Sequence, residues 1–164
     1  MEDNKVLKLI YTIFVGVLIA IFIGVGINTF YEAPKALKYP NELNFTSKEF
    51  TETEKAAEKL YQKQNDEYME KMKPYNRNVS VITLIAAVAL MGASILLQKR
   101  IKIIADGVML GGLFTLLYSI GRGFASENSQ YVFLATTVGL AVTVYLGYHR
   151  FVTDHPVNKK PKKK

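Results

Sequence analysis

The chain has 164 residues and no cysteine, and its 21 lysine and arginine residues outnumber its 14 acidic ones. Without cysteine, disulfides, thiolate nucleophiles and thiolate metal sites are excluded. Hydrophobic residues make up 49% of the chain, which is an ordinary share, but they are concentrated in a few long stretches. So short a chain has no outer shell to cover several such stretches, which argues against a soluble domain.

Four stretches are almost free of charge, namely residues 9–31, 78–98, 103–121 and 128–148, with Asp106 as the only acid inside them. Each exceeds or approaches the roughly 20 residues that a helix needs to cross a bilayer. The first stretch is too long for the core of a signal peptide, so an uncleaved anchor fits better. We therefore predict an all-α membrane protein, a bundle of four transmembrane helices with an extracytoplasmic amphipathic helix between the first and second.

The expected organisation follows from these stretches. It comprises residues 1–30 (N-terminal tail and first transmembrane helix), 31–77 (extracytoplasmic segment), 78–151 (transmembrane helices at about 78–98, 101–121 and 129–150) and 152–164 (basic tail). Lys99, Arg100 and Lys102 lie in the tight turn between the second and third transmembrane helices. Basic residues in short loops favour the cytoplasmic side, which predicts a multi-pass protein of the cell membrane with both termini in the cytoplasm.

The segment between the first two spans is predicted to contain a helix over about 47–73. Thr46 and Glu49 have the spacing of a capping box, and Pro74 is expected to end the helix or to kink it into the next span. Apolar residues recur at helical spacing on one face, which comprises Phe50, Ala57, Tyr61, Tyr68 and Met72. This face packs on the bilayer or on its own bundle, or it docks another protein or a second copy of the chain.

The C-terminal tail carries Lys159, Lys160, Lys162, Lys163 and Lys164. A basic run beside a membrane attracts anionic lipid by about 1 kcal/mol per lysine near the surface. Because no aromatic residues or folded module accompany it, we do not expect nucleic acid as a partner.

Small residues recur at every fourth position on three of the predicted spans, and this spacing predicts close helix packing in lipid. The candidate packing residues are Gly16, Ala20, Gly24, Gly107, Gly111, Ser119, Gly139 and Gly147. The second span has a looser set of small residues, so we expect it to be peripheral or to meet another subunit. A pore lined by small residues is the alternative.

Three polar residues inside or at the edges of the spans are candidates for function. Asn28 is expected to make a hydrogen bond between helices. Asp106 lies one turn into the third span, where the helix dipole and Lys102 favour a carboxylate, so an anchoring role is expected. Arg122, at the outer end of that span, is expected to pair with Glu127 or with a lipid phosphate.

No catalytic, cofactor or metal site is expected. The two histidines, His149 and His155, lie at a span boundary and in the tail without the spacing of metal ligands, and no serine nucleophile motif occurs. We therefore predict that the chain is not an enzyme.

The chain contains the run NTFYEAPK at 28–35, which leads to Tyr-Pro at 39–40, and the runs GGLF at 111–114 and GRGF at 121–124, and the likeness that they carry extends over most of the chain. With these runs the chain resembles a group of small, uncharacterised bacterial four-helix membrane proteins. The resemblance implies a bacterial inner membrane and carries no activity.

The leading hypothesis from the sequence is a non-catalytic scaffold or accessory subunit of a membrane complex. The alternative is a small pore or transporter made of several copies, and an enzyme acting on lipid comes third. The protein partner or homo-oligomer that these readings need is not specified by any motif in the chain.

Overall fold

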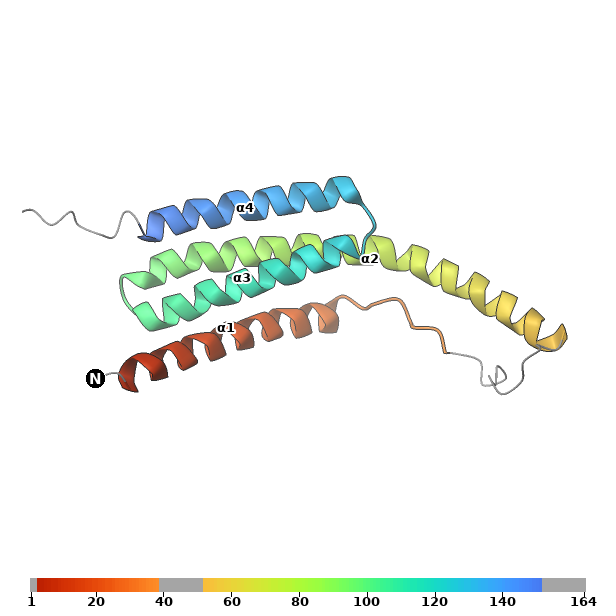
Figure 1. The fold of residues 1–164 in the computed structure, drawn as a ribbon, viewed down its shortest axis with the longest axis horizontal. Coiled ribbons are helices and arrows are strands. Elements are labelled where there is room, and N and C mark those ends of the chain that lie inside the picture. The colour runs from red at the N-terminus through yellow and green to blue at the C-terminus, as the bar shows by residue number, and fades with distance from the viewer. Residues whose placement is uncertain (1–2, 39–51, 152–164) are drawn as a thin grey trace, which may run out of the picture.

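In the computed structural model, which describes residues 3–38 and 52–151, the chain folds into α-helices joined by short turns (Figure 1). Within these residues the helices are α1 (Asp3–Phe30), α2 (Glu52–Gln98), α3 (Lys102–Phe124) and α4 (Ser129–Phe151). Each of the four described helices is long and apolar enough to cross a membrane. The prediction of an all-α chain with four such helices is confirmed.

The predicted amphipathic helix and the predicted second span form one continuous helix, α2. It runs for 47 residues through Pro74, or about 70 Å at 1.5 Å per residue. Pro74 lacks the N–H that would bond to the carbonyl of residue 70, yet the helix continues on both sides of it. The proline therefore does not end the helix, and the ribbon changes direction along α2 in Figure 1. Residues 52–73 project beyond the other helices, and we call them the α2 arm.

The helix α3 is the centre of the arrangement. It packs along α2 and along α1, while α1 and α4 lie on opposite sides of the α2–α3 pair (Figure 1). Among the described residues, α1 and α4 make no contact with each other.

Glycine residues explain how α3 packs closely against two neighbouring helices, α1 and α2. Gly107 and Gly111 face α1, where an added Cβ would lie 2.7 Å from Val15 and 2.9 Å from Ile19. Gly112 faces α2 instead, where a Cβ would lie 2.6 Å from Cγ of Met91. Because four residues turn a helix by about 40° beyond one full circle, the small-residue ridge of α3 winds from the α1 side toward the α2 side.

The buried face of α2 includes residues spaced by three or four positions, namely Ser80, Thr83, Ala87, Met91 and Ser94. Met91 is fully buried and fills the space opposite Gly112. The expectation that the second span is peripheral is therefore wrong, because Thr83 and Ala87 on α2 together with Gly112 on α3 allow the two helices to approach closely. The peripheral helix is α4, which rests on the pair through Ala135, Gly139 and Leu146.

The outward faces of the helices are apolar. Phe22 and Phe30 of α1, Leu96 of α2 and Phe133 of α4 are each at least three-quarters exposed. Threonine hydroxyls on all four helices donate to carbonyls four residues earlier, as Thr115 does to Gly111 at 2.8 Å. A polar group satisfied within its own helix tolerates a hydrocarbon environment. These features fit a multi-pass membrane protein.

The first turn of α1, the α2–α3 turn and the end of α4 lie at one end of the bundle, and the α3–α4 turn and the arm lie at the other (Figure 1). Lys99, Arg100 and Lys102 therefore share an end with Lys5 and Lys8. Several expectations lie outside the described residues, namely the capping box of Thr46 and Glu49, Phe50 of the partner face, and the tail lysines.

Candidate functional site

Polar and aromatic residues gather where the α2 arm leaves the bundle. Tyr75 follows Pro74 on α2, and Tyr31 follows the last residue of α1. The two rings stack with centroids 5.2 Å apart and planes 2° from parallel. The Tyr75 hydroxyl donates to the Tyr31 carbonyl at 3.4 Å, and the Asn78 amide donates to the Tyr31 hydroxyl at 2.9 Å. These contacts fix the end of α1 against α2.

Arg122 of α3 binds Asn76, the residue that follows Tyr75 on α2. Its Nη1 donates to Oδ1 of the buried Asn76 at 2.7 Å, and its Nε donates to the Tyr118 hydroxyl at 3.1 Å. The guanidinium also lies over the rings of Tyr75 and Tyr118, at 5.3 and 5.6 Å from their centroids. Asn76 in turn donates to the Ala125 carbonyl at 3.0 Å. We call Tyr31, Tyr75, Asn76, Tyr118 and Arg122 the base cluster.

Glu127 does not pair with Arg122, which corrects one of the two expected partners of that arginine. It pairs instead with Lys73, the last residue of the arm, at 2.9 Å. Hydrogen bonds to Glu70 and to Glu127 raise the pKa of Lys73 above its ordinary value. Glu127 has a φ of 55°, a left-handed conformation that costs a non-glycine residue roughly 1–2 kcal/mol. Glu127 adopts this conformation in the α3–α4 turn, and its carboxylate reaches Lys73 of the arm.

A pair of serines lies one turn deeper in the bundle. Ser80 of α2 donates to the Ser119 carbonyl at 2.6 Å, and Ser119 donates to the Ser80 carbonyl at 2.8 Å. Both side chains are fully buried. The Tyr131 hydroxyl of α4 donates to Oγ of Ser80 at 3.2 Å. Every buried side-chain nitrogen and oxygen in the described residues has a hydrogen-bond partner, so this polar layer is complete.

Sequence reasoning named Arg122 and Ser119 and missed the residues of α2 and α1 that hold them. A signal was present, because polar residues at 76 and 80 follow Pro74 at helical spacing on the buried face of α2. The predicted boundary between the outer segment and the second span, at residues 77 and 78, divides that spacing between two elements.

The other predicted polar residues lie apart from this cluster. Asn28 is exposed near the end of α1. Asp106 is half-buried at the opposite end of the bundle, where it lines a cavity with Lys8 and Lys102.

The predicted packing residues fall into two groups, those at helix contacts and those in open positions. Gly16 faces Leu110 of α3, Gly139 faces Leu116, and Ala20 is half-buried. A Cβ on Gly24 or Gly147 would meet nothing within 4 Å. The small-residue spacing therefore marks packed and open positions alike.

The predicted partner face is half-buried at Ala57, Tyr61, Tyr68 and Met72. Tyr68 lines a cavity together with Pro34 and Leu37, which belong to the chain that follows α1. Figure 1 shows that chain running beside the arm. Part of the predicted partner face is thus covered by the protein itself.

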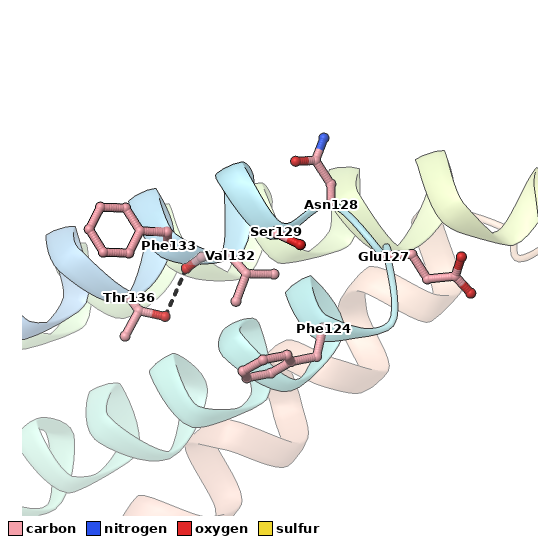
Figure 2. A pocket seen from close by; sticks show the side chains of 7 residues that line it. All are labelled: Phe124, Glu127, Asn128, Ser129, Val132, Phe133 and Thr136. Atoms are coloured by element: carbon pink, nitrogen blue, oxygen red, sulfur yellow. Dashed lines mark hydrogen bonds between the residues drawn. The ribbon is translucent and has the colours of Figure 1, made fainter.

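A crevice of about 380 Å³ opens between the end of α3 and the start of α4. Figure 2 shows Phe124 and Val132 facing each other across it, while Asn128 points away. The Thr136 hydroxyl at its inner end donates to the Val132 carbonyl at 2.8 Å. The lining of the crevice is therefore mainly apolar, and Glu127, Asn128 and Ser129 add polar side chains to it. In the described part of the chain, no three His, Asp or Glu residues are placed to hold a metal ion.

Comparison of the chain with family models, with curated proteins and with solved structures finds no match. The fold is that of a helical protein whose four described helices are long enough to cross a membrane, and one of these helices, α2, projects beyond the others.

Proposed function

We propose that the chain is a non-catalytic scaffold or accessory subunit of a membrane complex, and that the α2 arm is its docking element. The observation that carries the proposal is the base cluster, which joins α1, α2 and α3 where the arm leaves the bundle. An arm of about 22 residues extends some 33 Å from the bundle. A helix held at its base presents a fixed surface to a partner at little entropic cost.

The surface of the arm supports a protein partner. Leu60 is 58% exposed and Met69 is 46% exposed, on a helix that is otherwise rich in charge. Exposed apolar side chains on a projecting, charged helix are typical of interface anchors surrounded by a polar rim. The basic α2–α3 turn at the opposite end favours an extracytoplasmic position for the arm and a cytoplasmic position for both termini.

The docking surface is tested by extracting the tagged protein in a mild detergent and measuring the mass and composition of the particle. We expect a stoichiometric protein partner, or a second copy, that is retained by the wild type. Leu60→Gln and Met69→Gln should each lower the retained fraction several-fold, while Gln62→Ala, at an exposed polar position of the same helix, should leave it unchanged. Equal retention by all three variants would remove the arm from the interface.

The base cluster is tested separately. Arg122→Gln leaves the surface of the arm intact but removes the cation that binds Asn76 and stacks on Tyr75. We expect weaker partner retention and faster proteolysis at the lysines of the arm, with the four helices still inserted. A homogeneous homo-oligomer that carries ions across liposomes would instead favour a pore and overturn the proposal.

A further inference from the structure

The contact between α1 and α3 opens at the end of the bundle that carries the first turn of α1. At Gly107 and Gly111 the helices are in close contact. On the N-terminal side of Gly107 two cavities lie between them, of about 730 and 410 Å³. Both are lined by Lys8 of α1 and by Ile101 and Ile103 beside the start of α3, so they form one divided cleft.

The larger cavity carries charged and polar side chains on a lining that also includes Leu9, Ile101 and Ile103. Lys8 and Lys102 line it from different helices, and in the described part of the chain neither lysine forms an ion pair. Thr12 also lines it, and because its hydroxyl proton is donated to the Lys8 carbonyl at 2.8 Å, its oxygen is left as an acceptor. Asp106 adds a carboxylate. The lining therefore offers two cationic donors, two acceptor groups and a formal charge of +1.

The smaller cavity is apolar apart from Lys8. Leu7 and Tyr11 of α1 and Ile104 of α3 line it. Lys8 and Lys102 lie near the starts of α1 and α3, and in a bilayer that these helices cross they would lie near the level of the lipid phosphates. A cavity that carries charged side chains, next to one whose lining is apolar apart from Lys8, matches the two ends of a phospholipid.

We propose that the α1–α3 cleft binds one anionic phospholipid whose headgroup carries free hydroxyls, of the glycerol phosphate type. Lys8 and Lys102 bind the phosphate, the glycerol hydroxyls donate to Thr12 and Asp106, and an acyl chain lies along Leu7 and Ile104. A headgroup of charge −1 matches the lining. A zwitterionic headgroup has no net charge and leaves the formal charge of +1 on the lining unbalanced, and a serine headgroup brings a second carboxylate toward Asp106.

The site is tested with the full chain in detergent micelles. Native mass spectrometry measures the lipid retained from equal amounts of phosphatidylglycerol, phosphatidylethanolamine, phosphatidylserine and phosphatidic acid. Phosphatidylglycerol should be retained most. The double variant Lys8→Gln/Lys102→Gln should retain about thirty-fold less of it, if each lysine contributes about 1 kcal/mol and 1.4 kcal/mol is tenfold. The matched double variant Lys5→Gln/Lys99→Gln, which changes the same charge at the same end, should retain it as the wild type does.

Two further measurements separate the parts of the proposal. Asp106→Asn should lower the preference for phosphatidylglycerol over phosphatidic acid several-fold, because phosphatidic acid has no headgroup hydroxyl beyond its phosphate. Inorganic phosphate in excess should not displace the lipid, because the apolar cavity binds its acyl chain. Equal loss of lipid in the two double variants, an unchanged preference in Asp106→Asn, or displacement by phosphate would each overturn the assignment.

Discussion

The contact between Gly112 and Met91 makes a quantitative prediction about the packing of α2 on α3. A Cβ at position 112 would lie 2.6 Å from Cγ of Met91 and 3.2 Å from the Ala87 carbonyl oxygen, so Gly112→Ala must displace a fully buried side chain or separate two helices. Overpacking of this kind costs about 1–3 kcal/mol. Gly121→Ala on the same helix is the matched control, because a Cβ there would meet nothing within 4 Å.

Both substitutions gain helix propensity of up to about 1 kcal/mol, so the difference between them isolates the clash. We expect Gly112→Ala to be less stable than Gly121→Ala by roughly 2 kcal/mol. Equilibrium unfolding in mixed micelles can be followed by tyrosine emission, because the chain has ten tyrosines and no tryptophan. In a Met91→Ala background the cost of Gly112→Ala should fall by at least half. Equal free energies of unfolding for the two single variants would refute the assigned contact.

Two further predictions concern the polar layers near the arm. Ser80→Ala and Ser119→Ala should each lower the free energy of unfolding by about 0.6 kcal/mol, the average for hydrogen bonds between membrane helices, and by no more than about 1.7 kcal/mol. Because the two Oγ atoms also contact each other at 3.3 Å, the double variant should lose less than the sum; strict additivity would mean that the two hydroxyls act independently. The raised pKa of Lys73, which its pairs with Glu70 and Glu127 cause, means that these two ion pairs stabilise the fold fully below the ordinary lysine value of 10.5 and are lost as pH rises through the raised value. Proteolysis of the arm in the wild type should therefore be constant from pH 7 to about 10 and should increase only above it, whereas Lys73→Met should be cleaved faster across that range; a wild type that loosens below pH 9 would contradict the pairing.

The length of α2 shows where a local rule fails in this chain. Proline usually ends or bends a helix because it lacks an N–H and clashes with the preceding turn. Pro74 stands directly before Tyr75 and Asn76, whose contacts with Tyr31 and Arg122 hold the helix on the bundle side. Tertiary contacts of this kind offset the loss of one backbone hydrogen bond, and residue spacing alone does not reveal them.

The partner of Arg122 is a second case in which a rule based on the local sequence fails. The position of this arginine at the end of a span made it a candidate, and Glu127 was the nearest acid in the sequence. The left-handed conformation at Glu127 accompanies a carboxylate that reaches Lys73, while Asn76 and two tyrosine rings surround the guanidinium. Sequence distance predicts pairs within a helix, but a turn with one positive φ redirects its side chains.

By itself, the sequence determined the all-α class and the four helices of membrane length, because the apolar run needed to cross a bilayer is a property of consecutive residues. Only the tertiary structure decided that α3 is central, that α2 and not α4 is its close partner, and which glycines lie at contacts. In lipid every helix is apolar on all sides, so hydrophobicity does not mark the buried face. That choice depends on shape, such as Met91 against Gly112, and on the few polar groups that meet across helices, such as Ser80 and Ser119.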